Sequence, residues 1–306
     1  MLLENVKRLL ASRDRRAAPI GCRRIDGIEA VTRVLEVDQT PIGKTPRSCP
    51  ATYVGFWDGI RRLFAESGDA RVRGYGASRF SFNTAGGRCE SCEGQGLRRI
   101  EMSFLPDVQV VCEACGGQRF NQQTLHVRFK GRTIGDVLAM SVDEAAAYFE
   151  AHASIRHALE LLADVGLGYL RLGQPSPTLS GGESQRIKLV TELAKARPRA
   201  AAPVGRRPTP HTLYVLDEPT VGLHIADVER LMRVVHRLID SGNTVVAIEH
   251  NLDVMAEADW IIDLGPEGGA RGGRRVAAGP PEALMRAAAR SHTGRFLRDF
   301  MAERGA

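Results

Sequence analysis

Apolar and polar residues are arranged along the chain in patterns that predict its strands. Residues 31–37 alternate between apolar and polar side chains, which is typical of a strand with one buried face. The short apolar runs 212–216 and 244–248 are rich in strand formers and predict buried parallel strands. A further strand is expected over 260–264.

Apolar residues spaced three or four positions apart predict the helices. One helix begins at Ser180, because Ser180 and Glu183 have the spacing of a capping box and apolar residues follow on one face. Ser141 and Glu144 repeat that pattern, and an amphipathic helix is expected over 225–238. A short helix at the start and a helical tail complete the elements. Helices alternating with strands indicate an α/β fold.

Composition and charge narrow the class of protein. The chain has 306 residues, a net charge of +6 and a pI of about 9.2, which is compatible with a nucleic acid partner. It has no apolar run of 18 residues and no secretory signal pattern at its start, so neither a membrane span nor a membrane partner is expected. The cysteines are partly arranged in CxxC pairs, which favours metal over disulfides and a cytoplasmic location.

Four cysteines have the spacing of a zinc site. Cys89 and Cys92 form one CxxC pair, and Cys112 and Cys115 form another after 19 intervening residues. Two thiolate pairs on Gly-rich turns can close a tetrahedral zinc site, which is structural because no position is left open for water. The segment 97–111 between the pairs predicts a hairpin that turns at Pro106-Asp107, and its Arg98 and Arg99 offer contacts to a DNA backbone.

Two cysteines and a group of aromatic residues are interpreted as structural rather than functional. Cys22 and Cys49 have no partner in the CxxC pattern and are expected to be buried thiols. Aromatic and arginine side chains are interleaved over 51–80, where they could stack on nucleic acid. We favour the alternative that the aromatic residues belong to the core and the arginines to a solvated face.

The start of the helix at Ser180 has the character of an anion site. Gly181 and Gly182 leave backbone amides unshielded where the helix dipole is positive, and phosphate suits such a site. Two acids, Asp217 and Glu218, end one predicted strand, where one can hold Mg²⁺ and the other can orient or deprotonate an attacking water. His250 follows the next strand. In this order, the three stretches resemble the signature motif, the Walker B strand and the switch histidine of an ABC-type ATPase.

The printed sequence contains no phosphate-binding P-loop. Gly43-Lys44-Thr45 has the right ending, but the glycine required five residues earlier is replaced by Asp38, and Pro46 interrupts the helix that would follow. No other lysine has the glycine frame. Because a triphosphate is held by that loop, we expect this chain to require a domain that supplies one.

Several stretches together resemble one family, UvrA, the damage-sensing ATPase of bacterial UvrABC excision repair. They are Asp38-Gln39-Thr40-Pro41-Ile42-Gly43, Pro50-Ala51-Thr52-Tyr53, Arg79-Phe80-Ser81-Phe82-Asn83, Gly87-Arg88-Cys89-Glu90, Phe104-Leu105-Pro106-Asp107, Leu179 to Gln185, and Glu249 to Asp253. The resemblance begins near Asp38 and is to the C-terminal nucleotide-binding domain, just after the place of its P-loop.

The resemblance implies roles for individual residues. Gln39 would be the Q-loop glutamine near Mg²⁺ and the attacking water, Asp217 the Mg²⁺ residue, Glu218 the catalytic carboxylate and His250 the sensor of the γ-phosphate. The residues that would contact ATP held by an opposing P-loop are Ser180, Gly181, Gly182 and Gln185. The cysteine zinc site would belong to a module that contacts DNA.

The fold that the resemblance implies is an ABC-type ATPase domain with an inserted zinc-binding and helical subdomain. Residues 1–50 would be its N-terminal part, 51–170 the insertion, and 171–306 the part with signature, Walker B and switch residues. The implied partners are lesion-containing double-stranded DNA, a P-loop-bearing UvrA-like domain or homodimer, and a UvrB-like subunit. The alternatives are a non-catalytic, zinc-stabilised DNA-binding remnant, and a UvrA-like paralogue that confers resistance to DNA-binding drugs.

Overall fold

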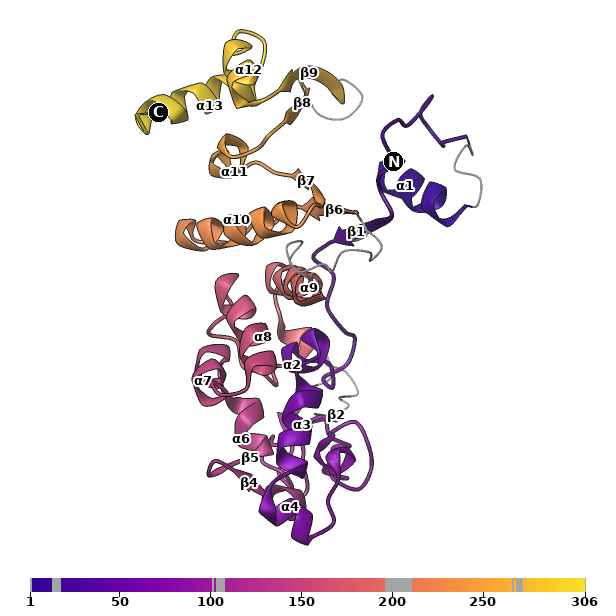
Figure 1. The fold of residues 1–306 in the computed structure, drawn as a ribbon, viewed down its shortest axis with the longest axis vertical. Coiled ribbons are helices and arrows are strands. Elements are labelled where there is room, and N and C mark those ends of the chain that lie inside the picture. The colour runs from indigo at the N-terminus through magenta and orange to yellow at the C-terminus, as the bar shows by residue number, and fades with distance from the viewer. Residues whose placement is uncertain are drawn as a thin grey trace, which may run out of the picture. The chain divides into compact units, whose positions relative to one another are not determined.

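The computed structural model describes residues 2–12, 18–100, 102, 108–195, 211–265, 267 and 272–305 (Figure 1). They group into two compact units. The first unit is formed by Met1–Leu216 with Glu229–Val246, and the second by Asp217–Val228 with Ala247–Ala306. The three-part division at residues 50 and 170 stays a prediction.

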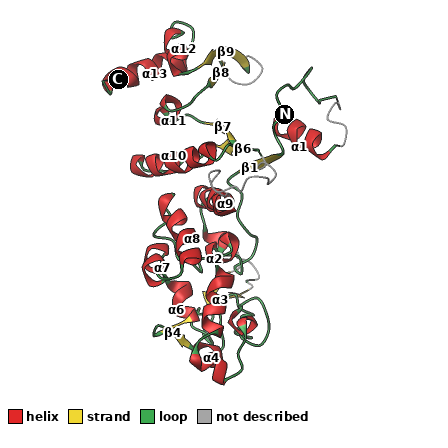
Figure 2. Ribbon diagram, in the orientation of Figure 1, coloured by secondary structure: helices red, strands yellow, loops and turns green. Residues whose placement is uncertain are grey.

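The first unit contains most of the helices (Figure 2). Its helices are α1 (Leu2–Ala11), α2 (Pro50–Val54), α3 (Trp57–Ala65), α4 (Gly68–Val72), α5 (Gln122–Leu125), α6 (Ile134–Ala139), α7 (Val142–Tyr148), α8 (Ala153–Asp164) and α9 (Gly181–Lys195), with the 3₁₀ turns η1 (Ala77–Phe80) and η2 (Ser176–Thr178). The predicted amphipathic helix is α10 (Ile225–Asp240), whose apolar side is buried through Val228, Leu231 and Leu238. None of the helices in the described part of the chain is long and apolar enough to cross a bilayer.

The central sheet has three strands in the order β1-β6-β7, namely β1 (Arg33–Val37), β6 (Thr212–Asp217) and β7 (Thr244–Ile248). β1 and β6 are parallel, with Val37 opposite Leu216. All but two residues of β6 are buried, as expected for a middle strand with helices on its faces. The predicted α/β fold with a parallel sheet is therefore confirmed.

The prediction that the strand at 244–248 is buried is wrong. Val246 is 39 % exposed and Ile248 is 53 % exposed. β7 lies at the edge of the sheet order, so only β6 pairs with it among the described residues. An edge strand lacks the second neighbour that covers a middle strand, which explains why an apolar sequence is exposed here.

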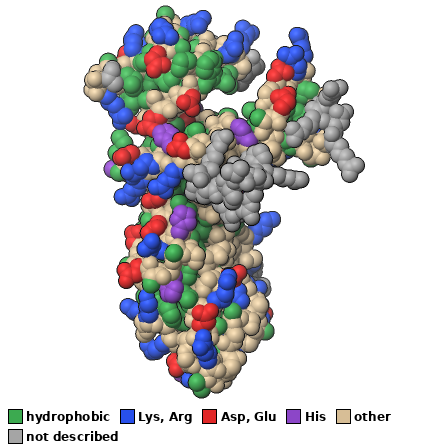
Figure 3. Space-filling model, in the orientation of Figure 1, with side chains coloured by type: hydrophobic (Ala, Val, Ile, Leu, Met, Phe, Trp, Pro, Cys, Tyr) green, Lys and Arg blue, Asp and Glu red, His purple; other side chains and the backbone are tan. Residues whose placement is uncertain are grey.

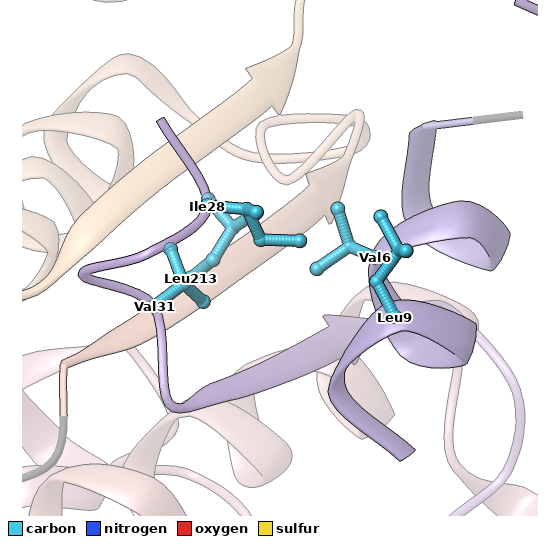
Figure 4. Packing of buried hydrophobic residues seen from close by; sticks show 5 residues of the cluster. All are labelled: Val6, Leu9, Ile28, Val31 and Leu213. Carbon is cyan, nitrogen blue, oxygen red and sulfur yellow. The ribbon is translucent and has the colours of Figure 1, made fainter. Parts of the chain in front are cut away.

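The helix α1 packs against β1 and β6 of the sheet. Its Val6 and Leu9 pack with Ile28, Val31 and Leu213, which form a small buried cluster beside β1 and β6 (Figure 4). The short N-terminal helix expected from the sequence is confirmed, and this contact explains how so short a helix is stabilised.

The aromatic residues of 51–80 belong mainly to the core of the first unit. Trp57, Phe64 and Phe80 are at most 4 % exposed, and Phe64 lies 5.6 Å from Phe80 between ring centres. Arg79 remains nearer the surface and lies over the ring of Tyr75 at 4.5 Å. The core interpretation of this stretch is confirmed, since the large rings are taken up by packing.

The hairpin expected between the cysteine pairs is also present. β2 (Leu97–Ile100) and β3 (Val108–Val111) are antiparallel, with Leu97 opposite Val111. A second small hairpin is formed by β4 (Arg128–Phe129) and β5 (Arg132–Thr133). The predicted turn at Pro106-Asp107 lies outside the described residues. Pro and Gly residues in the sequence also predict loops at 196–210 and 265–273. The first of these loops lies outside the described residues, and so does most of the second.

The second unit contains a short helix, then a hairpin, then two further helices, among the described residues. Its elements are α11 (Leu252–Ala256), β8 (Ile261–Gly265), β9 (Arg274–Gly279), α12 (Pro281–Arg286) and α13 (His292–Glu303). β8 and β9 are antiparallel, and the strand expected over 260–264 is confirmed. Asp263 of β8 accepts hydrogen bonds from Ser291 and Thr293 at the start of α13, which fixes the helical tail to the hairpin.

Candidate metal centre and nucleotide half-site

The four cysteines of the CxxC pairs converge on one point. The Sγ atoms of Cys89, Cys92, Cys112 and Cys115 all lie within 4.8 Å of one another, and all four residues are buried. Cys92 and Cys115 have their Sγ atoms 3.7 Å apart. Thiolates bound to tetrahedral zinc at about 2.3 Å are about 3.8 Å apart, so the cluster fits zinc.

Tight backbone turns bring each cysteine pair to the centre. Gly94 has a φ of +78°, and a Cβ at this position would meet the carbonyl oxygen of Phe82 at 1.9 Å. Only glycine satisfies both conditions. The turn also directs the amide of Gly96 to Cys92 Sγ at 3.3 Å. The Gly-rich sequence around the pairs is therefore needed to bend the chain around the sulfur atoms.

Burial and backbone amides act in opposite directions on the thiols. Burial raises the pKa of Cys115 to about 12 and also raises the pKa of Cys92. At Cys112 burial also raises the pKa, but hydrogen bonds from the amide and thiol of Cys115, the thiol of Cys92 and the amide of Ala114 together outweigh it and lower the pKa to about 7. A bound cation is what would hold all four as thiolates at neutral pH.

The two remaining cysteines differ from each other. Cys49 is fully buried at the start of α2, as predicted. Cys22 is exposed, so the prediction of a buried thiol is wrong there. Cys22 lies in the segment between α1 and β1, outside the described helices and strands.

The signature helix begins as the sequence predicts. Ser180 N donates to Glu183 Oε2 at 2.7 Å, and Glu183 N donates to Ser180 Oγ at 3.2 Å, which closes the capping box. The other oxygen of Glu183 accepts a hydrogen bond from the hydroxyl of Tyr169 at 2.5 Å. Gly181 and Gly182 remain partly exposed at the positive end of α9.

The Q-loop segment after β1 is attached to α9. Gln185 Nε2 donates to the carbonyl of Val37 at 2.8 Å, and Lys188 Nζ donates to the carbonyl of Asp38 at 3.1 Å and pairs with its carboxylate. Gln39 is exposed, and a Cβ on Gly181 would lie 3.0 Å from its side chain. The first unit therefore holds Gln39 beside the start of the signature helix.

The ion pair has an electrostatic effect on Asp38. Burial raises the pKa of the Asp38 carboxyl, but hydrogen bonds from Lys188 and Thr40 outweigh burial and hold the pKa below its usual value. Sequence reasoning missed Lys188. The signal is its position on the same helical face as Gln185, one turn later.

The acidic and switch residues lie in the second unit. Asp217 is the last residue of β6 and is exposed. Glu218 adopts a φ of +44°, and its amide donates to the carbonyl of Ile248 at 2.9 Å. His250 Nε2 lies 3.3 Å from Glu218 Oε1, so the predicted catalytic acid and switch residue face each other.

Glu249 fixes the loop that carries this pair, and sequence reasoning missed it too. Its carboxylate accepts the amide and the hydroxyl of Thr220, both at 2.9 Å, and the amide of His250 at 2.9 Å. Its place next to His250 is the only signal in the sequence. The predicted site residues are thus divided between the units: Gln39 and the signature residues are in the first, and Asp217, Glu218 and His250 are in the second.

A parallel sheet, a capped signature helix and a Glu–His pair after the strands define an ABC-type ATPase fold. No family model matches the chain. It is 58 % identical over 273 residues to UvrABC system protein A of Thermus thermophilus, covering 89 % of this chain and 27 % of that protein. With UvrABC system protein A of Aquifex aeolicus it shares 55 % identity over 278 residues, which is 91 % of this chain and 29 % of the relative.

A solved structure agrees with the sequence comparison. The crystal structure of UvrA2 from Deinococcus radiodurans matches 88 % of this chain with a TM-score of 0.80 and 51 % identity, and the match covers 32 % of that protein. The chain is therefore homologous to a part of UvrABC system protein A. It spans less than a third of the length of the Thermus and Aquifex proteins.

Proposed function

We propose that this chain is the signature-bearing, DNA-binding segment of a UvrA-like ABC ATPase that acts in nucleotide excision repair. The observation that carries the proposal is the identity of 55–58 % to UvrABC system protein A over about nine-tenths of the chain. The spatial pairing of Glu218 with His250 and the capped start of α9 support it.

Different residues of this chain have different roles toward ATP: some bind phosphate and others hold those residues in place. The amides of Ser180, Gly181 and Gly182 bind phosphate held against them by a P-loop, while the buried Gln185 keeps the Q-loop segment in place. This arrangement places the negative charge of the nucleotide at the positive end of α9, where the helix dipole favours it.

Hydrolysis uses the carboxylates. Asp217 is proposed to hold Mg²⁺, which neutralises charge on the phosphates when it is bound. Glu218, together with Gln39, orients the attacking water and accepts its proton, and His250 reports the γ-phosphate to Glu218 through their 3.3 Å contact.

The P-loop is proposed to come from another UvrA-like segment, either elsewhere in a longer chain or in a dimer partner. No lysine of the printed sequence has the required glycine frame, so a second copy of these residues cannot supply the loop. The edge strand β7 supports such a partner. A strand leading into a P-loop can add to the outer backbone edge of β7, and the exposed Val246 and Ile248 offer apolar surface for the same partner to cover.

Contact with lesion-containing duplex DNA is assigned to the zinc module. Lys and Arg side chains are spread over the face drawn in Figure 3 and alternate there with Asp and Glu. The described basic side chains are thus not gathered into one patch on that face. Zinc bound by the four cysteines stabilises this module. A UvrB-like subunit as a further partner and a cytoplasmic location, where thiols stay reduced, complete the proposal.

The test is to reconstitute the site with a P-loop. The chain is co-purified with a strand–P-loop–helix segment of a UvrA relative, and Mg²⁺-dependent ATP turnover is measured for the chain alone, for the complex, and for the complex with Glu218→Gln. We expect turnover in the unaltered complex only. Turnover that persists with Glu218→Gln contradicts the assignment of the catalytic carboxylate.

DNA binding separates repair from a non-catalytic role. Binding to ultraviolet-irradiated and undamaged duplexes is measured over a range of salt concentrations, with and without ATP. We expect a preference for the irradiated duplex that responds to ATP in the complex. Salt-sensitive binding with neither preference nor nucleotide response would instead favour a zinc-stabilised binding module without catalysis.

A further inference from the structure

The segment from Gly43 to Ser48 lies between the metal centre and the signature motif. It follows the Q-loop and leads directly into α2. Its backbone has few hydrogen bonds of its own, and side chains from two other parts of the first unit bind it instead. Such a segment is positioned by its neighbours rather than by its own secondary structure.

Arg119 is the main contact from the side of the cysteines. Its Nη1 donates to the carbonyl of Pro46 at 2.9 Å, and its Nη2 donates to the carbonyl of Gly173 at 2.7 Å. Arg119 is only 4 % exposed, and its guanidinium lies 5.0 Å from the centre of the Phe82 ring. One planar cation therefore joins two carbonyls that are far apart in the sequence, which the fixed fork of arginine allows.

The position of Arg119 is set by the metal-binding turns. It comes four residues after Cys115, and its carbonyl accepts the amide of Cys89 at 2.9 Å. Its φ is +70°, a conformation that a residue with a side chain keeps only when its surroundings hold it. Those surroundings include both cysteine pairs, since Cys89 bonds to the carbonyl of Arg119 and Cys115 lies in the turn just before it.

The signature side holds the same segment through Ser176. Its hydroxyl donates to the carbonyl of Gly43 at 2.9 Å, and its amide donates to the carbonyl of Ser48 at 2.8 Å. A second, exposed link joins Arg47 to Glu93 of the first cysteine turn, with 2.8 Å between Nη2 and Oε2. The buried link through Arg119 is the one that water cannot replace.

We propose that Arg119 is a positioning residue that makes the four-cysteine metal centre and the segment Gly43–Ser48 move as one body. Filling of the metal centre then fixes this segment and the loop at Gly173. Both lead to predicted ATP-site residues, the first backwards to Gln39 and the second forwards to Ser180. The inference goes beyond the proposed function, because it concerns this chain without nucleotide, DNA or partner.

The first experiment compares the unaltered chain loaded with zinc and stripped of zinc by a chelator. Amide hydrogen exchange is followed at Ser48, Gly173 and Ser176, with the amides of α8 as the internal reference. We expect exchange at the three amides to rise by about tenfold on zinc removal, because hydrogen bonds from a charged donor are lost. Unchanged exchange at these amides in a chain that has lost its zinc overturns the proposal.

The second experiment removes the fork while keeping the length of the side chain. Arg119→Met is compared with Arg88→Met, which removes an arginine of the same module whose partner is Glu90 on the surface. Cobalt binding, read from its absorption spectrum, reports whether four thiolates still surround the metal. We expect Arg119→Met to bind cobalt but to show fast exchange at Ser48 and Ser176 with or without metal, and Arg88→Met to behave like the unaltered chain.

The proposal is overturned if zinc removal accelerates amide exchange in Arg119→Met as much as it does in the unaltered chain. If Arg119→Met does not fold, Arg119→Lys keeps the charge but offers one nitrogen where two carbonyls must be joined, and it should weaken the metal effect at Gly173 or at Ser48. If zinc removal accelerates exchange at both amides of Arg119→Lys as much as in the unaltered chain, the two-carbonyl contact of the guanidinium is not what couples them to the metal centre. Failure of the unaltered chain to bind cobalt would remove the metal centre itself, a result independent of any ATP measurement.

Discussion

The cysteine cluster and the sheet edge at β7 are opposites within one chain. All four cysteines are buried, and the short turns that carry them lie within about thirty residues. β7 is built from equally apolar residues, yet Ile248 at its end is 53 % exposed. The cluster is completed by its own turns, whereas a parallel strand needs neighbours from distant parts of a chain.

This difference shows which kinds of site a segment of a protein can complete with its own residues. Local sites close through turns, because each glycine-rich loop brings its own ligands together. The proposed nucleotide site draws its residues from the ends of separate strands and helices, so it would be complete only when the whole sheet is present. The four-cysteine centre should therefore form in this chain alone, whereas the nucleotide site should not.

Removal of zinc should have the largest effect. Structural zinc in small modules is worth about 10 kcal/mol or more, so chelation should unfold the region 85–120. Alkylation of thiols measures this directly: in the zinc-loaded chain we expect Cys22 alone among the six cysteines to react, and after chelation the four ligands as well. Cys22→Ser is the control and should abolish labelling of the loaded chain. If the four ligand cysteines stayed protected from alkylation after zinc removal, the cluster would not depend on the metal, which contradicts this expectation.

The next effect concerns Glu218 in the complex with a P-loop segment. Glu218→Gln should lower ATP turnover by about 100-fold or more, because proton transfer and orientation of the water are lost. Unfolding midpoints should stay close to the unaltered chain, since the side chain of Glu218 is 41 % exposed. Glu229→Gln, an equally conservative change on the exposed side of α10, is the control and should leave turnover as it was.

A pair of apolar truncations compares the exposed strand β7 with a buried position in the core of the first unit. Leu162 of α8 is fully buried, and Leu162→Ala should cost about 2–5 kcal/mol in the free energy of unfolding, because it leaves a cavity. Ile248→Ala should cost less than about 0.5 kcal/mol in the chain alone, since the side chain is already exposed. It should instead weaken binding of the P-loop segment. Denaturant unfolding and a pull-down titration measure both, and equal losses of stability would contradict the comparison.

The smallest effect is expected at the ion pair of Lys188 and Asp38. Lys188→Met should cost at most about 1 kcal/mol of stability at neutral pH, because the pair is partly solvated. The pKa of Asp38 is lowered in the folded chain, so the contribution is complete above the unfolded value of 3.8 and is lost as the pH falls through the lowered value. Unfolding measured at neutral and strongly acidic pH should show the two chains converging in acid. Lys7→Met, a change at a more exposed ion pair, is the control.

Local patterns predicted much of this structure. The capping boxes at Ser141 and Ser180, the buried strand β6 and the hairpin between the cysteine pairs follow from spacings of a few residues. These features depend on contacts between near neighbours, which the sequence states directly.

What could not be predicted depends on distant contacts. The exposure of β7 follows from strand order, and the exposure of Cys22 follows from its place between α1 and β1, where none of the described helices and strands covers it. Arg119 lies among several arginines near the cysteines, and only its hydrogen bonds to Pro46 and Gly173 distinguish it. A sequence pattern does not contain pairings across such separations.

The backbone of Glu218 has a consequence for how this segment evolves. Its φ of +44° is a conformation that asparagine or glycine adopts at lower cost than glutamate. A copy relieved of its chemical duty would gain stability by exchanging this residue, so drift should erase the acid early. If Glu218 has the proposed catalytic role, a lineage that uses it retains the glutamate against the preference of its own backbone.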